Sequence, residues 1–96
     1  MVKFMNINFN LDIGKIYAWT RNQDEEFVYN INRKNRKYRD VIVKVLMPGD
    51  YVMFLEPPKG LGHNNLLYCK VITADGIIGF IMWDNYSYGA FTMLHE

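Results

Sequence analysis

The chain has 96 residues, of which half are apolar, 16% are aromatic and 22% are charged, and its formal net charge is +1. This length fits a single domain over residues 1–96, and the apolar fraction excludes a disordered chain, because such chains cannot offset the entropy of ordering. A single cysteine and two distant histidines exclude a disulfide framework and a multi-cysteine zinc site, so we expect no metal and no cofactor.

The N-terminal half alternates polar and apolar residues and is rich in β-branched and aromatic types, a pattern that predicts strands. A first strand is expected at residues 15–20, followed by a polar, acidic loop. Residues 27–31 and 38–45 are expected to pair as a hairpin with a basic tip at 32–37. A short helical turn over residues 24–29 is the alternative for the start of this region.

Proline and glycine mark the boundaries in the C-terminal half. A turn at residues 47–50 precedes a strand at 51–55, and two prolines and two glycines make 56–65 a loop. There follow a strand at 66–73, an Asp-Gly hairpin turn at 74–76, a strand at 77–83, a helical turn or bend at 84–87 and a last strand at 90–94. Several short strands separated by turns indicate a small all-β sandwich or barrel.

Short motifs in this half resemble the Src homology 3 family of small barrels, eukaryotic or bacterial. They are Pro-Gly-Asp at 48–50, Tyr-Cys-Lys-Val at 68–71, Asp-Gly at 75–76, Gly-Phe-Ile at 79–81 and Asp-Asn-Tyr at 84–86. The aromatic segment at 16–19 and the acidic one at 24–27 are similar to the family's first strand and RT loop. The resemblance covers residues 15–95 and implies one barrel of five to six antiparallel strands.

Two departures from the family pattern lie at its peptide-binding groove. The RT region is enlarged, so that residues 21–45 form an extended RT-loop hairpin. The proline that the family carries before its Asn-Tyr turn is replaced by Met82 and Trp83. Both departures alter the groove that binds proline-rich ligands in the family, so the resemblance does not by itself predict such a ligand.

Aromatic side chains are the candidate contact surface for a protein segment, because rigid rings bind with little loss of entropy. Alternation in the strand at 66–73 places Cys69 and Val71 inward and Tyr68 outward, at the position of the family's ligand-binding tryptophan. Each ring can instead fill the core, and Cys69 is expected to be a buried core residue. The candidates are Tyr17, Trp19, Tyr68, Trp83, Tyr86 and Tyr88, of which all but Tyr88 are assigned to the expected surface.

Charge suggests two further contact regions. The acidic residues Asp24, Glu25 and Glu26 could pair with an arginine of a partner, or form a solvated loop. Residues 1–45 carry nine Lys/Arg against five Asp/Glu, and residues 46–96 carry two against five. The excess comes from a basic segment that could bind phosphates, or form a solvated hairpin tip: Arg33, Lys34, Arg36, Lys37 and Arg39.

No pattern predicts catalysis, because no local motif pairs a nucleophile with a base. The longest uncharged apolar stretch, residues 76–83, is far shorter than the ~20 residues of a membrane helix. Without a signal sequence we expect a cytoplasmic, non-catalytic module that binds a protein. Ten asparagines against three alanines fit an AT-rich genome and hence a small phage or viral effector acting on a host protein. The alternatives are a nucleic-acid-binding barrel and a structural subunit of a larger assembly.

Overall fold

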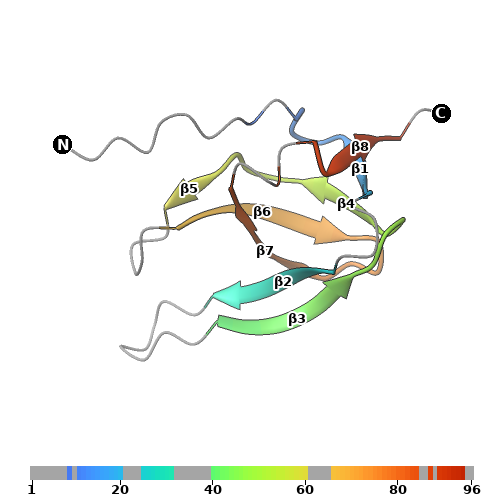
Figure 1. The fold of residues 1–96 in the computed structure, drawn as a ribbon. Coiled ribbons are helices and arrows are strands. Elements are labelled where there is room, and N and C mark those ends of the chain that lie inside the picture. The colour runs from blue at the N-terminus through green and yellow to red at the C-terminus, as the bar shows by residue number, and fades with distance from the viewer. Residues whose placement is uncertain are drawn as a thin grey trace.

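The chain folds into β-strands connected by turns. The computed structural model describes residues 9, 11–20, 25–31, 40–60, 66–84, 87 and 89–94. Within them the backbone forms eight strands and no helix (Figure 1). In chain order these are β1 (Ile16–Trp19), β2 (Glu26–Ile31), β3 (Asp40–Leu46), β4 (Tyr51–Phe54), β5 (Lys59–Gly60), β6 (Leu67–Thr73), β7 (Ile78–Trp83) and β8 (Phe91–Met93). The all-β prediction is confirmed.

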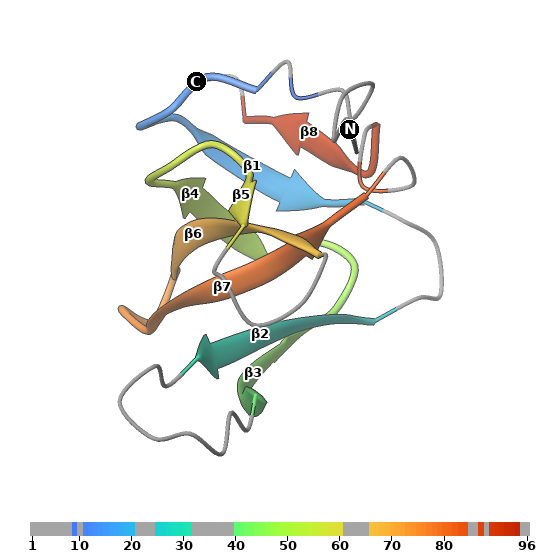
Figure 2. The ribbon, with the colours of Figure 1, turned by 90° about the vertical axis from the view of Figure 1, so that its left-hand side faces the viewer.

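The strands pair antiparallel in one sheet, in the order β3-β2-β7-β6-β4-β1-β8, with β5 paired to β6. The sheet curves, with β1 and β8 at the top and β2 and β3 at the bottom of both ribbon views (Figures 1 and 2). Among the described residues no ladder joins the edge strands β3 and β8, so the sheet is open. The closure expected of a five- to six-stranded barrel is not confirmed, and the described residues form eight strands.

Two regions account for the larger number of strands. The predicted hairpin forms as β2 and β3, which contradicts the alternative of a helical turn over 24–29, while its basic tip lies outside the described residues. The strand β5 lies inside the predicted loop at 56–65 and pairs with the start of β6. A two-residue strand has no periodicity that could be recognised in a sequence, so it exists only through that pairing.

The predicted turns hold the sheet in register. In the first, Asp50 caps the turn, because its carboxylate Oδ2 accepts a hydrogen bond of 2.8 Å from the Met47 N–H. The N–H of Gly49, at φ +96°, donates to the Trp19 carbonyl oxygen at 2.7 Å and ties this turn to β1. In the Asp-Gly turn, the Thr73 hydroxyl donates to Asp75 and accepts from the Ile77 N–H at 3.0 Å.

The concave side of the sheet is filled by aromatic rings. Phe54 is completely buried, and its ring centroid lies 5.6 Å from that of Trp83 and 5.1 Å from that of Phe91, both edge-on. Trp83 in turn stacks on Phe91 at 6.0 Å. The rings come from β4, β7 and β8, so the core joins strands that lie far apart in the sheet.

The strand β7 approaches β2 closely at Gly79. A Cβ atom at this position would lie 2.6 Å from Cγ1 of Val28 and 2.8 Å from the carbonyl oxygen of Tyr29. Only glycine fits such a close backbone contact. The approach brings the β2–β3 hairpin against the rest of the sheet.

Candidate functional site

The predicted aromatic surface lies largely in the core. Tyr17, Trp19, Tyr68 and Trp83 are each at most 3% exposed, so in this structure they support the fold and offer almost no area to a partner. Tyr17 and Trp19 point into the core from β1, and Trp19 packs on Phe91 with ring centroids 5.1 Å apart. A chain this short has few residues with which to fill its core, and large rings fill it efficiently.

Tyr68 is buried in a different environment. As predicted, it lies on the opposite face of β6 from Cys69 and Val71, which belong to the main core. It is covered there in a second cluster, together with Tyr29, Phe80 and Met82. Strand alternation alone therefore identified the face of this residue and not its burial.

The charged candidates are only partly described. Glu25 is exposed, and Glu26 at the start of β2 is half-buried, with Oε1 accepting from the Phe27 N–H at 3.0 Å. The remaining sequence candidates lie outside the described residues: Asp24, Tyr86, Tyr88, Arg33, Lys34, Arg36, Lys37 and Arg39.

The convex side of the sheet carries a row of apolar side chains that sequence reasoning missed. Register places Ile16 opposite Met53, Met53 opposite Ile72, and Ile72 opposite Ile78. Leu94 extends the row past β8, because its N–H donates to the Ile16 carbonyl oxygen at 3.1 Å. Directly opposed residues share one face of a sheet, so these five form one surface, which we call the apolar row. At a strand spacing of about 4.8 Å it spans about 19 Å along the curved sheet.

The apolar row is open to solvent at three of its five positions. Ile16 is 42% exposed, Leu94 40% and Ile78 55%, while Met53 and Ile72 are half-buried between them. Single exposed apolar side chains are ordinary, but a contiguous set is typical of an interaction surface.

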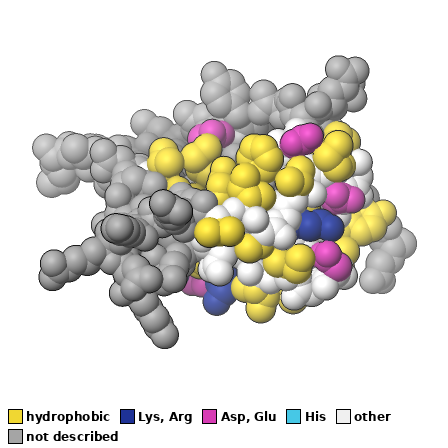
Figure 3. All heavy atoms as spheres, turned by 90° about the horizontal axis from the view of Figure 1, so that it is seen from below, with side chains coloured by type: hydrophobic (Ala, Val, Ile, Leu, Met, Phe, Trp, Pro, Cys, Tyr) yellow, Lys and Arg dark blue, Asp and Glu magenta, His cyan; other side chains and the backbone are white. Residues whose placement is uncertain are grey.

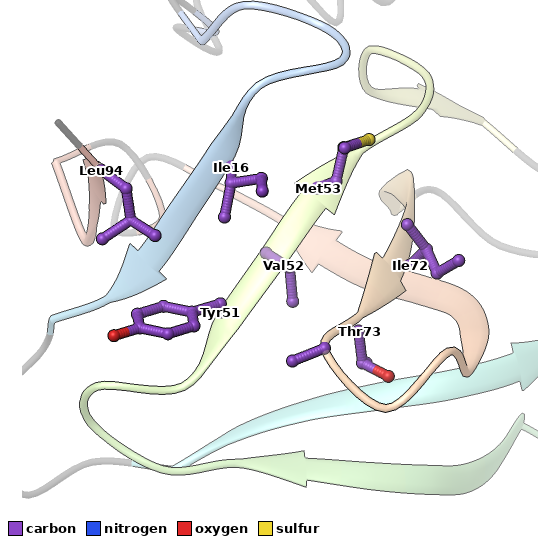
Figure 4. Close-up of a pocket in the computed structure, with 8 residues that line it drawn as sticks. Ile16, Tyr51, Val52, Met53, Ile72, Thr73 and Leu94 are labelled. Atoms are coloured by element: carbon purple, nitrogen blue, oxygen red, sulfur yellow. The ribbon is translucent and has the colours of Figure 1, made fainter. Parts of the chain in front are cut away.

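An open hollow of about 350 Å³ lies beside the middle of the row. Its lining is mainly apolar: Ile16, Tyr51, Val52, Met53, Ile72, Thr73, Ala74 and Leu94. In Figure 4 the side chains of Leu94, Ile16 and Tyr51 lie on one side of β4, and those of Ile72 and Thr73 lie on the other. Tyr51 is 46% exposed, so an apolar side chain of a partner could pack against its ring.

A polar cleft of about 290 Å³ adjoins the hollow and shares Tyr51, Thr73 and Ala74 with it. Its charged groups are Lys44, Asp50 and Asp75. The ammonium of Lys44 lies 3.2 Å from Oδ2 of Asp75, whose Oδ1 accepts from the Thr73 hydroxyl. The hydrogen bond from Thr73, followed by that from Lys44, lowers the pKa of the Asp75 carboxyl below its ordinary value. The carboxylate is therefore held in its charged form.

The described part of the chain is acidic, with eight Asp/Glu against four Lys. Three of the four lysines are in ion pairs: Lys44 with Asp75, and both Lys59 and Lys70 with Glu56. These residues present no basic face to a phosphate backbone. Any such face would need the basic segment that lies outside them.

A second apolar zone lies along the edge strand β3. Val41 and Ile42 in this strand and Met47 directly after it are all exposed. Figure 3, which views the molecule from the side of β2 and β3, shows hydrophobic side chains gathered there among a few charged ones. The strand carries Lys44, and the register of β2 against β3 shifts between Val28 and Tyr29. A lysine and a bulge are the features by which sheet edges avoid pairing with other chains.

The remaining chemistry of the described residues is sparse. Cys69 is completely buried, as predicted, and burial raises the pKa of its thiol, so it is not an activated nucleophile. Across the described ranges no three His, Cys, Asp or Glu side chains gather closely enough to hold a metal ion. The same ranges include no helix that is long and apolar enough to span a membrane.

Comparisons with known proteins are negative: no family model matches the chain, and no curated protein or solved structure is significantly similar to it. The apolar row and its surroundings are therefore the guide to function.

One signal in the sequence could have found this row. The strands at 51–55, 66–73 and 77–83 carry apolar residues at successive positions, more than one buried face requires.

Proposed function

We propose that this protein is a non-catalytic interaction module that binds a protein segment across the apolar row and the adjoining hollow. The observation that carries the proposal is the register that aligns five apolar side chains on the convex face, three of them at least 40% exposed. Burying such side chains on binding is favourable by about 25 cal/mol per Å². The binding residues are thus not the buried rings expected from the sequence.

We also propose that the fold is an Src-homology-3-like barrel with an enlarged RT-loop hairpin. The order β8-β1-β4-β6-β7 and the tight turn between β6 and β7 support it. In this interpretation β2 and β3 are the enlarged hairpin, which pairs with β7 through Tyr29 and Phe80. A cytoplasmic phage or viral effector that acts on a host protein remains the proposed biological setting, supported by composition alone.

The test compares the apolar row with the exposed apolar side chains of β3. The full chain is tagged, a partner is captured from host lysate with and without nuclease, and the affinity of the purified pair is measured. The double variant Ile16→Ser/Ile78→Ser should weaken binding at least about tenfold, as truncation of interface anchors does. The control is Val41→Ser on β3, because Val41 is as exposed as Ile78. The affinity of this variant for the partner should stay within about twofold of that of the parent chain.

Other outcomes would contradict the proposal. A loss of affinity in Val41→Ser and none in the double variant, with unchanged melting curves, would place the partner on β3. Captured material that disappears with nuclease would instead support a nucleic-acid-binding barrel that uses Arg33, Lys34, Arg36, Lys37 and Arg39. Stable self-association that the double variant abolishes would indicate a structural subunit.

A further inference from the structure

We infer that the bound protein segment places an apolar side chain in the hollow beside Tyr51 and a lysine or arginine in the polar cleft between Asp50 and Asp75. The inference rests on the proposed function and specifies the chemistry of the partner. It assigns roles to residues that the sequence did not single out.

The hollow and the cleft share one wall. Tyr51, Thr73 and Ala74 line both the hollow and the cleft. The hollow continues from this wall along Ile16, Met53 and Ile72, whereas the cleft continues to Lys44, Asp50 and Asp75. A partner segment that packs against Tyr51 would therefore contact apolar side chains in the hollow and carboxylates in the cleft.

The charged groups of the cleft are mainly acidic. Two carboxylates face one ammonium, and that ammonium is already engaged by Asp75 at 3.2 Å. Asp50 uses only Oδ2, to cap the turn; Oδ1 accepts no hydrogen bond from any residue that the structure describes. The cleft thus keeps a net negative charge and an available acceptor, a combination that suits a Lys ammonium or an Arg guanidinium.

Hydrogen bonds hold the two turns that line the cleft, so the cleft is pre-formed. Gly49 and Gly76, in the turns that carry the two carboxylates, both adopt the positive φ that these turns require. The N–H of Gly49 donates a hydrogen bond to the Trp19 carbonyl oxygen at 2.7 Å, and the N–H of Gly76 donates to the Thr73 carbonyl oxygen at 3.0 Å. A pre-formed site binds with a smaller loss of conformational entropy than a mobile one.

The partner's charge also decides between possible occupants. An acidic segment or a phosphate backbone would meet Asp50 and Asp75 and be repelled. A second copy of this chain would offer a surface that is itself acidic over the described residues, with most of its lysines already paired. A basic, apolar protein segment is complementary to both depressions.

An array of immobilised synthetic peptides tests the inference with the full chain as the probe. Each peptide carries Leu, Phe or Trp next to Arg, Lys, Gln or Glu in an otherwise Gly-Ser sequence. Peptides with Arg or Lys should bind about fivefold more tightly than their Gln counterparts, as expected for one partly exposed charge-assisted pair. The preference should diminish as salt is raised.

Variants locate the effect in the cleft. Asp50→Asn and Asp75→Asn keep an acceptor for the turn and should each reduce the preference for Arg and Lys. Glu56→Gln is the matched control, because Glu56 is an acidic residue that pairs with Lys59 and Lys70 and does not line the cleft. It should leave the preference unchanged. Asp50→Lys should shift selection toward Glu.

The outcomes separate this inference from the proposed function. The inference is wrong if the peptides show no preference for Arg or Lys and yet bind the Tyr51→Ser variant more weakly than the parent chain. That result would show binding through the hollow and would agree with the proposed interaction module. A preference for Glu in the parent chain would also overturn the inference. If no peptide binds and the affinity of the captured partner is unaffected by Ile16→Ser/Ile78→Ser, the proposed function fails as well.

Discussion

The two faces of β7 carry similar side chains and have different roles. Gly79, Ile81 and Trp83 face the core and are buried, whereas Ile78 on the other face is 55% exposed. The difference arises because the sheet curves: its concave side closes on Phe54 and Phe91, while its convex side is left open at the apolar row. Hydrophobicity along a strand therefore does not by itself distinguish a buried face from an exposed one.

The largest expected effect contrasts two positions of this one strand. Trp83→Ala removes a ring that packs between Phe54 and Phe91 and should lower the free energy of unfolding by about 4 kcal/mol. Ile78→Ala, on the exposed face, should change it by less than about 1 kcal/mol. Urea unfolding monitored by circular dichroism measures both. Comparable losses at the two positions would mean that Ile78 is packed as tightly as Trp83.

The close approach between β7 and β2 gives the next effect. Gly79→Ala places a methyl group 2.6 Å from Val28 Cγ1, and the resulting strain should lower the free energy of unfolding by about 3 kcal/mol. Gly60→Ala on β5 is the matched control, since a Cβ there has nothing within 4 Å, and its effect should stay under about 0.5 kcal/mol. A stable Gly79→Ala protein would show that β2 and β7 can separate freely.

The buried thiol makes stability depend on pH in the alkaline range. Because burial raises the pKa of Cys69 in the folded state, the thiol ionises first in the unfolded chain. The buried neutral thiol contributes in full to the free energy of unfolding below pH ~8.5. Above that value this contribution should fall by up to about 1.4 kcal/mol for each pH unit. Parallel urea titrations of the parent and of Cys69→Ala check this. The two slopes against pH should diverge above pH ~8.5, and identical slopes would show that the thiol is accessible to solvent.

The smallest effect concerns the polar cleft. Hydrogen bonds from Thr73 and then Lys44 lower the pKa of Asp75, so its contribution to stability is present above the pKa of the unfolded chain. That contribution is lost as pH falls through the lower, folded value. Asp75→Asn should flatten the acid side of a plot of melting temperature against pH. Glu25→Gln, at an exposed residue for which the structure shows no ion pair, should leave that plot unchanged.

Local patterns were sufficient for most of the strands and turns. Alternation and turn residues predicted β4, β6 and β7, the Asp-Gly turn and the inward face of Cys69. They could not predict β5, which exists through its pairing with β6, or the depth at which Tyr17 and Trp19 are buried. Burial depends on which strands cover a face, and that is a property of the whole sheet.

The sequence by itself determined that this chain folds as antiparallel strands around a dense aromatic core, because periodicity and turn chemistry act over a few residues. The tertiary structure alone decided which apolar residues remain exposed. Leu94, Ile16, Met53, Ile72 and Ile78 lie on five separate segments and meet only through the register of four pairings. A surface assembled by long-range register cannot be located from any one strand, since each strand shows only that it carries more apolar residues than one buried face requires.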